Sequence, residues 1–229
     1  MSISKDSRLY KILRTVYRIC IKDRDKEFYI RQFKKGDMVL DVGCGNNSPI
    51  MTKNIAGDIY YVGVDIGDYN NAKESIEQAD EYILSTPEDF YKTIRSIDHL
   101  FDYAIWSHNI EHCNYPMETL DAICDRLKPG GKLYLSCPSE KSVKLPHRKG
   151  TLNFYDDPSH IYLPIFKDII SRFNDNGMKI IFAAKQYRTV KLIILGLINE
   201  IKSRKQDKVL VGTWALWGFE TLIWAEKKK

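Results

Sequence analysis

The most specific stretch of the chain is Val-Leu-Asp-Val-Gly-Cys-Gly-Asn-Asn, at residues 39–47. Its apolar start predicts a buried strand, and its two glycines allow the backbone to turn sharply and approach a ligand closely. Asp65 ends the next apolar run, about 20 residues after Gly45, where a carboxylate can accept hydrogen bonds from two ribose hydroxyls. The stretch therefore predicts a nucleotide-binding turn at the end of a strand.

Further apolar runs of strand length alternate with helix-length segments along the chain. The strands are expected at residues 38–42, 59–64, 81–84, 101–106, 131–137, 178–184 and about 213–225. The clearest helices are expected at 116–127, 164–175 and 189–203. This alternation predicts an α/β fold with a doubly wound, seven-stranded, mainly parallel sheet whose last strand is antiparallel.

The domain organisation follows from where this pattern begins and where it is interrupted. Residues 1–36 carry apolar side chains at helical spacing and predict an N-terminal helical cap over 4–33. Residues 37–229 predict one domain. Within it, 138–163 lacks periodicity and is expected to be a long functional loop over the acceptor, and 189–203 is an unusually apolar helix.

Composition excludes several classes of protein. The 229 residues are 44% hydrophobic and 28% charged, which is ordinary for a globular protein, and no apolar run is long enough for a membrane span. Five cysteines without a Cys-x-x-Cys pair indicate free thiols in a reducing cytoplasm. The net charge of +5 comes from basic ends around an acidic middle. Those ends are either solvated or face an anionic partner such as a lipid head group, a nucleic acid or a phosphorylated sugar.

Two classes of nucleotide cofactor fit the glycine turn. A dinucleotide fingerprint requires a third glycine, but Ser48 and Pro49 stand in that region. Asp41 lies two residues before Gly43, and a fixed negative charge there suits an ammonium or sulfonium better than a pyrophosphate.

Four motifs, which follow one another in a characteristic order, show a resemblance to a known protein family. Asp-Val-Gly-Cys-Gly is followed by Val-Gly-Val-Asp, by Ser-His-x-x-Glu-His and by Leu-Lys-Pro-Gly-Gly-Lys-Leu. Over residues 37–137 the chain resembles class I S-adenosylmethionine-dependent methyltransferases. It is most similar to the small-molecule group that includes ubiquinone-biosynthesis O-methyltransferases and sugar or surface-glycan methyltransferases. The resemblance implies a Rossmann-like fold and S-adenosylmethionine as the cofactor.

The resemblance also implies which residues hold that cofactor. The glycine turn would hold the methionine part, the end of the second strand would hold the ribose and flank the adenine, and the residues after the third strand would meet the adenine amino group. The implied cofactor residues are Asp41, Gly43, Cys44, Gly45, Asp65, Ile66, Ser85, Thr86 and Ser107. Ser85 and Thr86 depart from the acidic residue that the family often has there.

Three of the five histidines are candidate bases for a hydroxyl acceptor, because histidine titrates near neutral pH. His108 and His112 follow the fourth strand, and His160 ends an Asp-Pro-x-His string that faces the acceptor in related small-molecule methyltransferases. Two other interpretations of the first pair remain open. On a helix, His108, Glu111 and His112 would share a face and could bind a divalent metal, although we assign no metal ligand; alternatively they only fix the start of a helix.

The sequence favours methyl transfer to a hydroxyl of a small molecule, above all a sugar or surface-glycan precursor in polysaccharide biosynthesis. The alternatives are a quinone or lipid-linked O-methyltransferase and a non-catalytic protein that binds S-adenosylmethionine. A nucleic-acid acceptor is disfavoured, since no Asn-Pro-Pro-Tyr string or Pro-Cys nucleophile follows the fourth strand. The expected location is the cytoplasm or the inner membrane face, and the helix at 189–203 is expected to cover the sheet, form a homodimer contact or touch a membrane.

Overall fold

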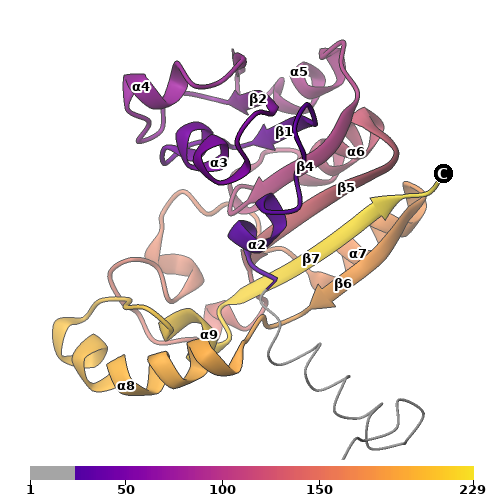
Figure 1. Ribbon diagram of the computed structural model, residues 1–229. Coiled ribbons are helices and arrows are strands. Elements are labelled where there is room, and N and C mark those ends of the chain that lie inside the picture. The colour runs from indigo at the N-terminus through magenta and orange to yellow at the C-terminus, as the bar shows by residue number, and fades with distance from the viewer. Residues whose placement is uncertain (1–23) are drawn as a thin grey trace, which may run out of the picture.

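A computed structural model describes residues 24–229 of the chain. These residues form a seven-stranded sheet in the order β3-β2-β1-β4-β5-β7-β6 (Figure 1). The strands are β1 (Met38–Val42), β2 (Tyr60–Asp65), β3 (Glu81–Leu84), β4 (Phe101–Ser107), β5 (Leu127–Pro138), β6 (Met178–Ala184) and β7 (Glu220–Lys227). The first five strands pair in parallel, and β7 is antiparallel to both β5 and β6. The predicted α/β, doubly wound, mainly parallel sheet is confirmed.

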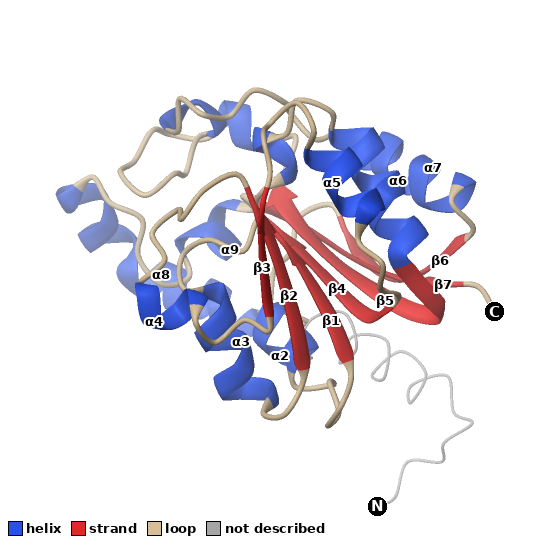
Figure 2. Cartoon of the chain, turned by 90° about the horizontal axis from the view of Figure 1, so that it is seen from above, coloured by secondary structure: helices blue, strands red, loops and turns tan. Residues whose placement is uncertain are grey.

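Helices cover both faces of the sheet (Figure 2). They are α2 (Lys26–Ile30), α3 (Ser48–Ala56), α4 (Lys73–Ile76), α5 (Phe90–Ser96), α6 (Pro116–Arg126), α7 (Phe166–Asp175), α8 (Val190–Gln206) and α9 (Thr213–Trp217). Ile94 of α5, Leu120 of α6 and Phe173 of α7 pack on one face. Tyr29 of α2 packs on the other face, against Tyr134 and Trp224. Two apolar layers therefore bury the parallel strands on both sides, as their continuous apolar runs require.

The strand order places a ligand crevice at one edge of the sheet. The chain winds outward from β1 through β2 to β3 and then returns to β4 on the other side of β1. In such sheets ligands bind beyond the carboxyl ends of the strands where the winding reverses, here between β1 and β4. Pro138 at the end of β5 pairs with Glu220 at the start of β7, so Glu220 lies on this same edge.

The connection between β6 and β7 is a helical hairpin that projects beyond the sheet at lower left in Figure 1. Helices α8 and α9 meet at two glycines. A Cβ built on Gly196 would lie 2.4 Å from the main-chain oxygen of Gly212, so the two backbones touch where side chains are missing. Among residues 24–229, no helix is long and apolar enough to cross a bilayer.

Three predicted elements differ from the structure. The fifth strand was expected from residue 131, but β5 begins at Leu127. The last strand was expected from residue 213, but 213–217 form α9 and the strand begins at Glu220. Gly212 and Gly218, both at positive φ, bound a short apolar turn, and periodicity alone does not distinguish such a run from a strand. The N-terminal helix was expected to reach residue 33, but α2 ends at Ile30 and a turn closed by Lys34 and Asp37 follows. The rest of the predicted cap, residues 1–23, lies outside the described residues.

Residues 138–163 form the predicted long loop between β5 and α7. It contains two single turns of 3-10 helix, η3 (Ser142–Lys144) and η4 (Phe154–Asp156). Asp156 holds the loop together, since its Oδ2 accepts hydrogen bonds from the main-chain nitrogens of Arg148, Leu152 and Asn153. Arg148 anchors the loop to α8 through paired hydrogen bonds to Glu200. These hydrogen bonds fix the loop in place beside the carboxyl ends of the parallel strands, which form the carboxyl edge of the sheet.

Candidate active site

The turn between β1 and α3, residues 43–47, contains the two glycines and is called the cradle below. Gly43 has a φ of +71°, and a Cβ there would lie 2.4 Å from the side chain of Asn109. A Cβ on Gly45 would lie 2.8 Å from the main-chain oxygen of Tyr69. The two glycines therefore allow the turn to fit between the segments that follow β4 and β2.

Replacing Gly43 by alanine is expected to destabilise the protein by more than the cost of a positive φ alone. Gly177 provides a matched control, because its φ is +69° and no atom lies within 4 Å of its added Cβ. We expect Gly177→Ala to cost about 1 kcal/mol and Gly43→Ala at least twice that, with loss of cofactor binding. Urea unfolding and calorimetric titration would measure both effects; equal costs for the two variants would contradict a crowded cradle.

Asp65 ends β2 beside this cradle and is 5% exposed. Its Oδ1 accepts a hydrogen bond of 2.7 Å from the main-chain nitrogen of Ile66. Burial raises the pKa of Asp65 to about 6, against the lowering effect of main-chain N–H groups such as that of Ile66. The carboxylate is therefore held in one orientation by the backbone, and it is costly to ionise until a partner arrives.

Apolar side chains flank Asp65 on the neighbouring strand ends. Ile66 is 54% exposed and Leu84, which pairs in register with Asp65, is 57% exposed. Exposed apolar groups beside a carboxylate at a strand end suit the faces of an adenine ring. Ser85 and Thr86 follow Leu84, but their hydroxyl groups bond to Thr93 and to the main chain of Asp89. Their predicted contact with the adenine stays a prediction, and Leu84, which the sequence did not single out, is a further candidate.

Asp41 lies beneath the cradle and is fully buried. Its Oδ2 accepts hydrogen bonds from the hydroxyl groups of Ser48 and Tyr61, at 2.6 and 2.7 Å. Lys26 Nζ lies 3.8 Å from the same oxygen, and Oδ1 is buried without a hydrogen-bond partner. Oδ1 is thus the atom that remains for the predicted interaction with the amino group of the cofactor.

The two other predicted cofactor residues differ in what they can offer. Cys44 is fully buried, and a Cβ on Gly63 would lie 2.7 Å from its sulfur, so the thiol packs on β2 and only its main chain is left for the cofactor. Ser107 ends β4, and its Oγ lies 3.0 Å from the Oγ of Ser136 on β5. Ser107 is therefore on the carboxyl edge, between the cradle and the acceptor side.

His108 is held between two carboxylates. Its Nδ1 lies 3.3 Å from Glu111 Oε1 and its Nε2 lies 3.0 Å from Glu220 Oε1. The ring also lies against Trp214 and Phe219, with centroids 5.1 and 6.2 Å away. Burial favours the neutral ring, but the hydrogen bonds to the two carboxylates outweigh it and raise the pKa of His108 to about 10.

This geometry argues against the predicted role of His108 as a base. An imidazolium at neutral pH has no lone pair to accept a proton. His108 also has a φ of +48°, which is uncommon outside glycine and asparagine and marks a backbone held by its surroundings. The helix that would bring His108, Glu111 and His112 onto one face is not formed, since a 3-10 turn, η2 (Ile110–His112), stands there. His108 does contact Glu111, but its other ring nitrogen bonds to β7. Glu220 was missed because it lies 112 residues away in sequence.

Replacing His108 by asparagine, which tolerates positive φ, is expected to destabilise the protein by about 2–4 kcal/mol at pH 7, because two carboxylates lose their shared cation. A histidine whose folded pKa is raised stabilises fully below its unfolded pKa of about 6.5 and loses that contribution as the pH rises through about 10. The difference between wild type and His108→Asn in urea unfolding should therefore shrink from pH 7 to pH 10. A constant difference would contradict the buried imidazolium.

His112 and His160 meet although they are far apart in sequence. The main-chain nitrogens of Ile161 and Tyr162 both donate to the main-chain oxygen of Glu111, which joins the long loop to η2. The ring centroids of His112 and His160 are 4.8 Å apart. His160 Nδ1 lies 2.6 Å from the carbonyl oxygen of Phe154, and His112 Nδ1 lies 3.1 Å from that of Ser159. Each Nδ1 therefore donates to a carbonyl, which leaves the lone pair on each Nε2.

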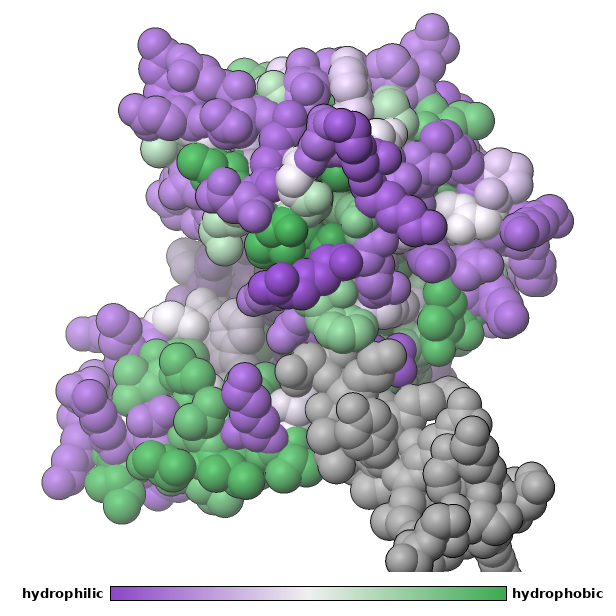
Figure 3. Space-filling view, in the orientation of Figure 1, coloured by the Kyte–Doolittle hydropathy of each residue, from purple (hydrophilic) through white to green (hydrophobic). Residues whose placement is uncertain are grey.

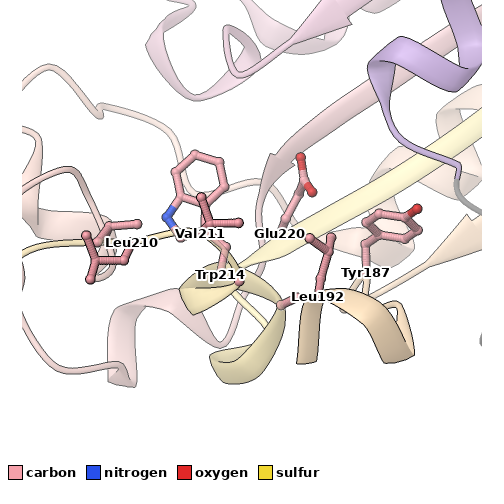
Figure 4. A pocket seen from close by; sticks show the side chains of 9 residues that line it. Tyr187, Leu192, Leu210, Val211, Trp214 and Glu220 are labelled. Carbon is pink, nitrogen blue, oxygen red and sulfur yellow. The ribbon is translucent and has the colours of Figure 1, made fainter. Parts of the chain in front are cut away.

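A pocket of about 360 Å³ lies where the helical hairpin meets the sheet edge (Figure 4). Glu220 contributes a carboxylate to the wall of the pocket, and the other side chains that line it are mainly apolar. Its lining residues are Tyr187, Leu192, Val209, Leu210, Val211, Gly212, Trp214, Ala215 and Glu220. Trp214 and Glu220 also contact His108, so the pocket adjoins the residues that follow β4.

The sheet order, the glycine cradle and the carboxylate at the end of β2 together define a class I S-adenosylmethionine-dependent methyltransferase. The chain belongs to the methyltransferase domain family, whose model matches residues 13–182. Among curated relatives, an uncharacterized protein of Methanocaldococcus jannaschii is 35% identical over 107 residues, which is 44% of this chain and 28% of that protein. The demethylmenaquinone methyltransferase of Listeria welshimeri is 22% identical over 68% of this chain and 72% of its own length.

Solved structures share the fold at low sequence identity. A Haloferax volcanii putative methyltransferase, in complex with the Trm112 methyltransferase activator, matches with a TM-score of 0.60, 14% identity and coverage of 98% of this chain and 95% of the other. A SAM-dependent methyltransferase from Archaeoglobus fulgidus matches at 0.53, with 19% identity and coverage of 94% and 99%. The plantazolicin methyltransferase BamL, solved with S-adenosylhomocysteine, matches at 0.57, with 13% identity and coverage of 89% and 82%.

The cradle fits S-adenosylmethionine. The tight turn at Gly43 and Gly45 admits no side chain, Asp65 has a carboxylate at the end of the next strand, and Asp41 keeps one buried oxygen without a partner. When bound, S-adenosylmethionine supplies an electrophilic methyl group on a sulfonium. The protein must then place an acceptor atom in line with that methyl group and exclude water.

Proposed function

We propose that the protein transfers the methyl group of S-adenosylmethionine to a hydroxyl of a small molecule whose body is apolar. The observation that carries this proposal is the apolar pocket at the carboxyl edge, next to the residues that follow β4. Neighbouring strands lie about 4.8 Å apart, so the edge from β1 across β4 and β5 to β7 spans about 15 Å. A cofactor over β1 and β4 and an acceptor over β5 and β7 would meet on this edge.

We assign the base to His112. Its Nδ1 donates to the carbonyl of Ser159, so Nε2 is the nitrogen that can accept a proton from the acceptor hydroxyl. His160 packs against it with a side chain only 4% exposed, which suits a positioning residue better than one that touches substrate. As the hydroxyl proton moves to Nε2, the oxygen forms a bond to the methyl carbon, and the electron pair of the breaking carbon–sulfur bond stays on sulfur.

The pocket lining supports one acceptor class over another. Leu192, Leu210 and Val211 offer no hydrogen bonds to the several hydroxyl groups of a free sugar. They suit an isoprenoid, acyl or aromatic body, as in a quinone or a lipid-linked glycan precursor. The sugar acceptor favoured by the sequence is therefore retained in our proposal only as the head group of a lipid.

The test is transfer of label from methyl-labelled S-adenosylmethionine in the presence of two acceptor sets. One set contains short-chain hydroquinones and lipid-linked sugars in detergent, and the other contains the corresponding free sugars. We expect label in the organic extract of the first set, in an ether that survives mild base. Label only on free sugars would refute the apolar acceptor, and label on neither would favour a non-catalytic role.

A further inference from the structure

Helix α8 is apolar around most of its circumference, although it lies at the surface. Its inner face packs on α9, where Gly196 is buried against Gly212. A helix that is apolar on opposite faces is ordinarily enclosed by other protein or by lipid. In the described part of the chain, α9 and the long loop cover the inner side only, so the outer side of α8 needs another explanation.

The outer side of α8 carries a continuous apolar stripe. Its residues recur at a spacing of three or four and therefore share one face. The members are Val190, Ile194, Leu197, Ile198 and Ile201, which are between 45% and 70% exposed. Figure 3 shows hydrophobic side chains gathered over α8. Single exposed apolar residues need no explanation, but an uninterrupted stripe along a helix marks an interaction surface.

Cationic side chains flank the stripe. The exposed lysines in and just after α8 are Lys191, Lys202, Lys205 and Lys208. The acidic side chain of the same helix, Glu200, is engaged by Arg148 and Arg204 and is 15% exposed. The exposed charge around the stripe is therefore mainly positive, which complements an anionic surface.

The proposed acceptor pocket lies in the same helical hairpin as the stripe. Val211 is 65% exposed and also lines the pocket, and Leu192 lines it from the inner face of α8. A protein docked through the stripe would thus hold the pocket about one helix diameter, roughly 10 Å, from the lipid layer.

We propose that the outer face of α8 docks on an anionic lipid surface and that the protein takes its acceptor from that layer. The proposal rests on the proposed function for the acceptor, but the docking itself depends only on the stripe and its lysines. The combination of an apolar face and flanking lysines is that of helices which lie in the plane of a membrane interface.

The test is flotation with vesicles of phosphatidylcholine alone or of phosphatidylcholine with phosphatidylglycerol, using the full chain. We expect binding to the anionic vesicles that weakens as salt rises, since part of the attraction is electrostatic. The double variant Ile198→Asp/Ile201→Asp should reduce vesicle binding at least about tenfold, with unchanged S-adenosylhomocysteine affinity. Leu100→Asp is the matched control, because Leu100 is 46% exposed and lies just before the amino end of β4.

Two results would overturn the docking. One is that the wild-type protein does not bind anionic vesicles. The other is that the double variant binds them as strongly as the wild type does. If a second copy covers the stripe instead, light scattering will show a wild-type dimer, a monomeric double variant and no flotation, which also refutes the proposal. Failure of the proposed function is distinguishable, because vesicle binding would persist while no detergent-solubilised acceptor is methylated.

Discussion

Replacing Asp65 by asparagine is expected to weaken S-adenosylhomocysteine binding by at least about 100-fold and to stabilise the unliganded protein. Asparagine keeps an oxygen for the main-chain nitrogen of Ile66 but loses the charged acceptor for the ribose hydroxyl groups. Calorimetric titration and urea unfolding measure the two effects on the same sample.

The stabilisation follows from the direction of the pKa shift. Burial raises the pKa of Asp65 from 3.8 to about 6, so its ionised form is less favourable in the folded chain than in the unfolded chain. Stability therefore falls as the pH rises from about 4 to 6, and at pH 7 the ionised side chain costs on the order of 1–3 kcal/mol. The asparagine variant lacks this cost. Cofactor binding has the opposite pH dependence, since it needs the carboxylate and should weaken as the pH falls through about 6.

Leu84→Asn provides a control for Asp65, because it changes the predicted adenine contact without changing the charge. We expect it to weaken binding by about tenfold, with little pH dependence. If Asp65→Asn binds S-adenosylhomocysteine like wild type, the assignment of the ribose site is wrong. If it binds weakly but is also less stable than wild type at pH 7, the carboxylate is part of the structure rather than a group kept for a ligand.

The second large effect is expected at His112. Replacing it by alanine should lower kcat by about 10²- to 10⁴-fold, the usual contribution of a positioned base, while S-adenosylhomocysteine affinity stays unchanged. Added imidazole should restore part of the rate, because it can supply the base that the variant lacks. His160→Ala should lower kcat less, since it removes only the ring packed on His112.

His99 is the matched control for a histidine outside the site. It lies just before β4 at the opposite edge of the sheet and bonds to Glu81. His99→Ala should leave kcat within about twofold. A fully active His112→Ala variant would move the base elsewhere, with His160 or Glu220 as the next candidates.

Much of the fold was predictable because its signals are local. The run at 39–47 contains a buried strand and two glycines, and each later parallel strand shows its own continuous apolar run. The prediction was wrong at residues 213–217, where an apolar turn of helix between two glycines has the composition of a strand. Local pattern did not show that the helix at 26–30 ends early, because a turn held by Asp37 replaces it.

The site was predictable where sequence neighbours act together, and less so where distant segments meet. Gly43, Gly45 and Asp65 lie together at the ends of adjacent strands, as parallel pairing requires. The contact of His112 with His160 depends on how the long loop returns to η2, which no local pattern encodes. The same holds for Glu220, which changes His108 from a candidate base into a buried cation. Long-range pairing of this kind is visible only in the folded chain.

The most direct test of the whole account is a crystal structure of the protein with S-adenosylhomocysteine. We expect the ribose hydroxyl groups on Asp65, the adenine between Ile66 and Leu84, and the sulfur beyond Ser107 on the side of His112 and the apolar pocket. Density for the ligand outside the cradle, or a sulfur that faces away from His112 and the pocket, would contradict the proposed path of the methyl group.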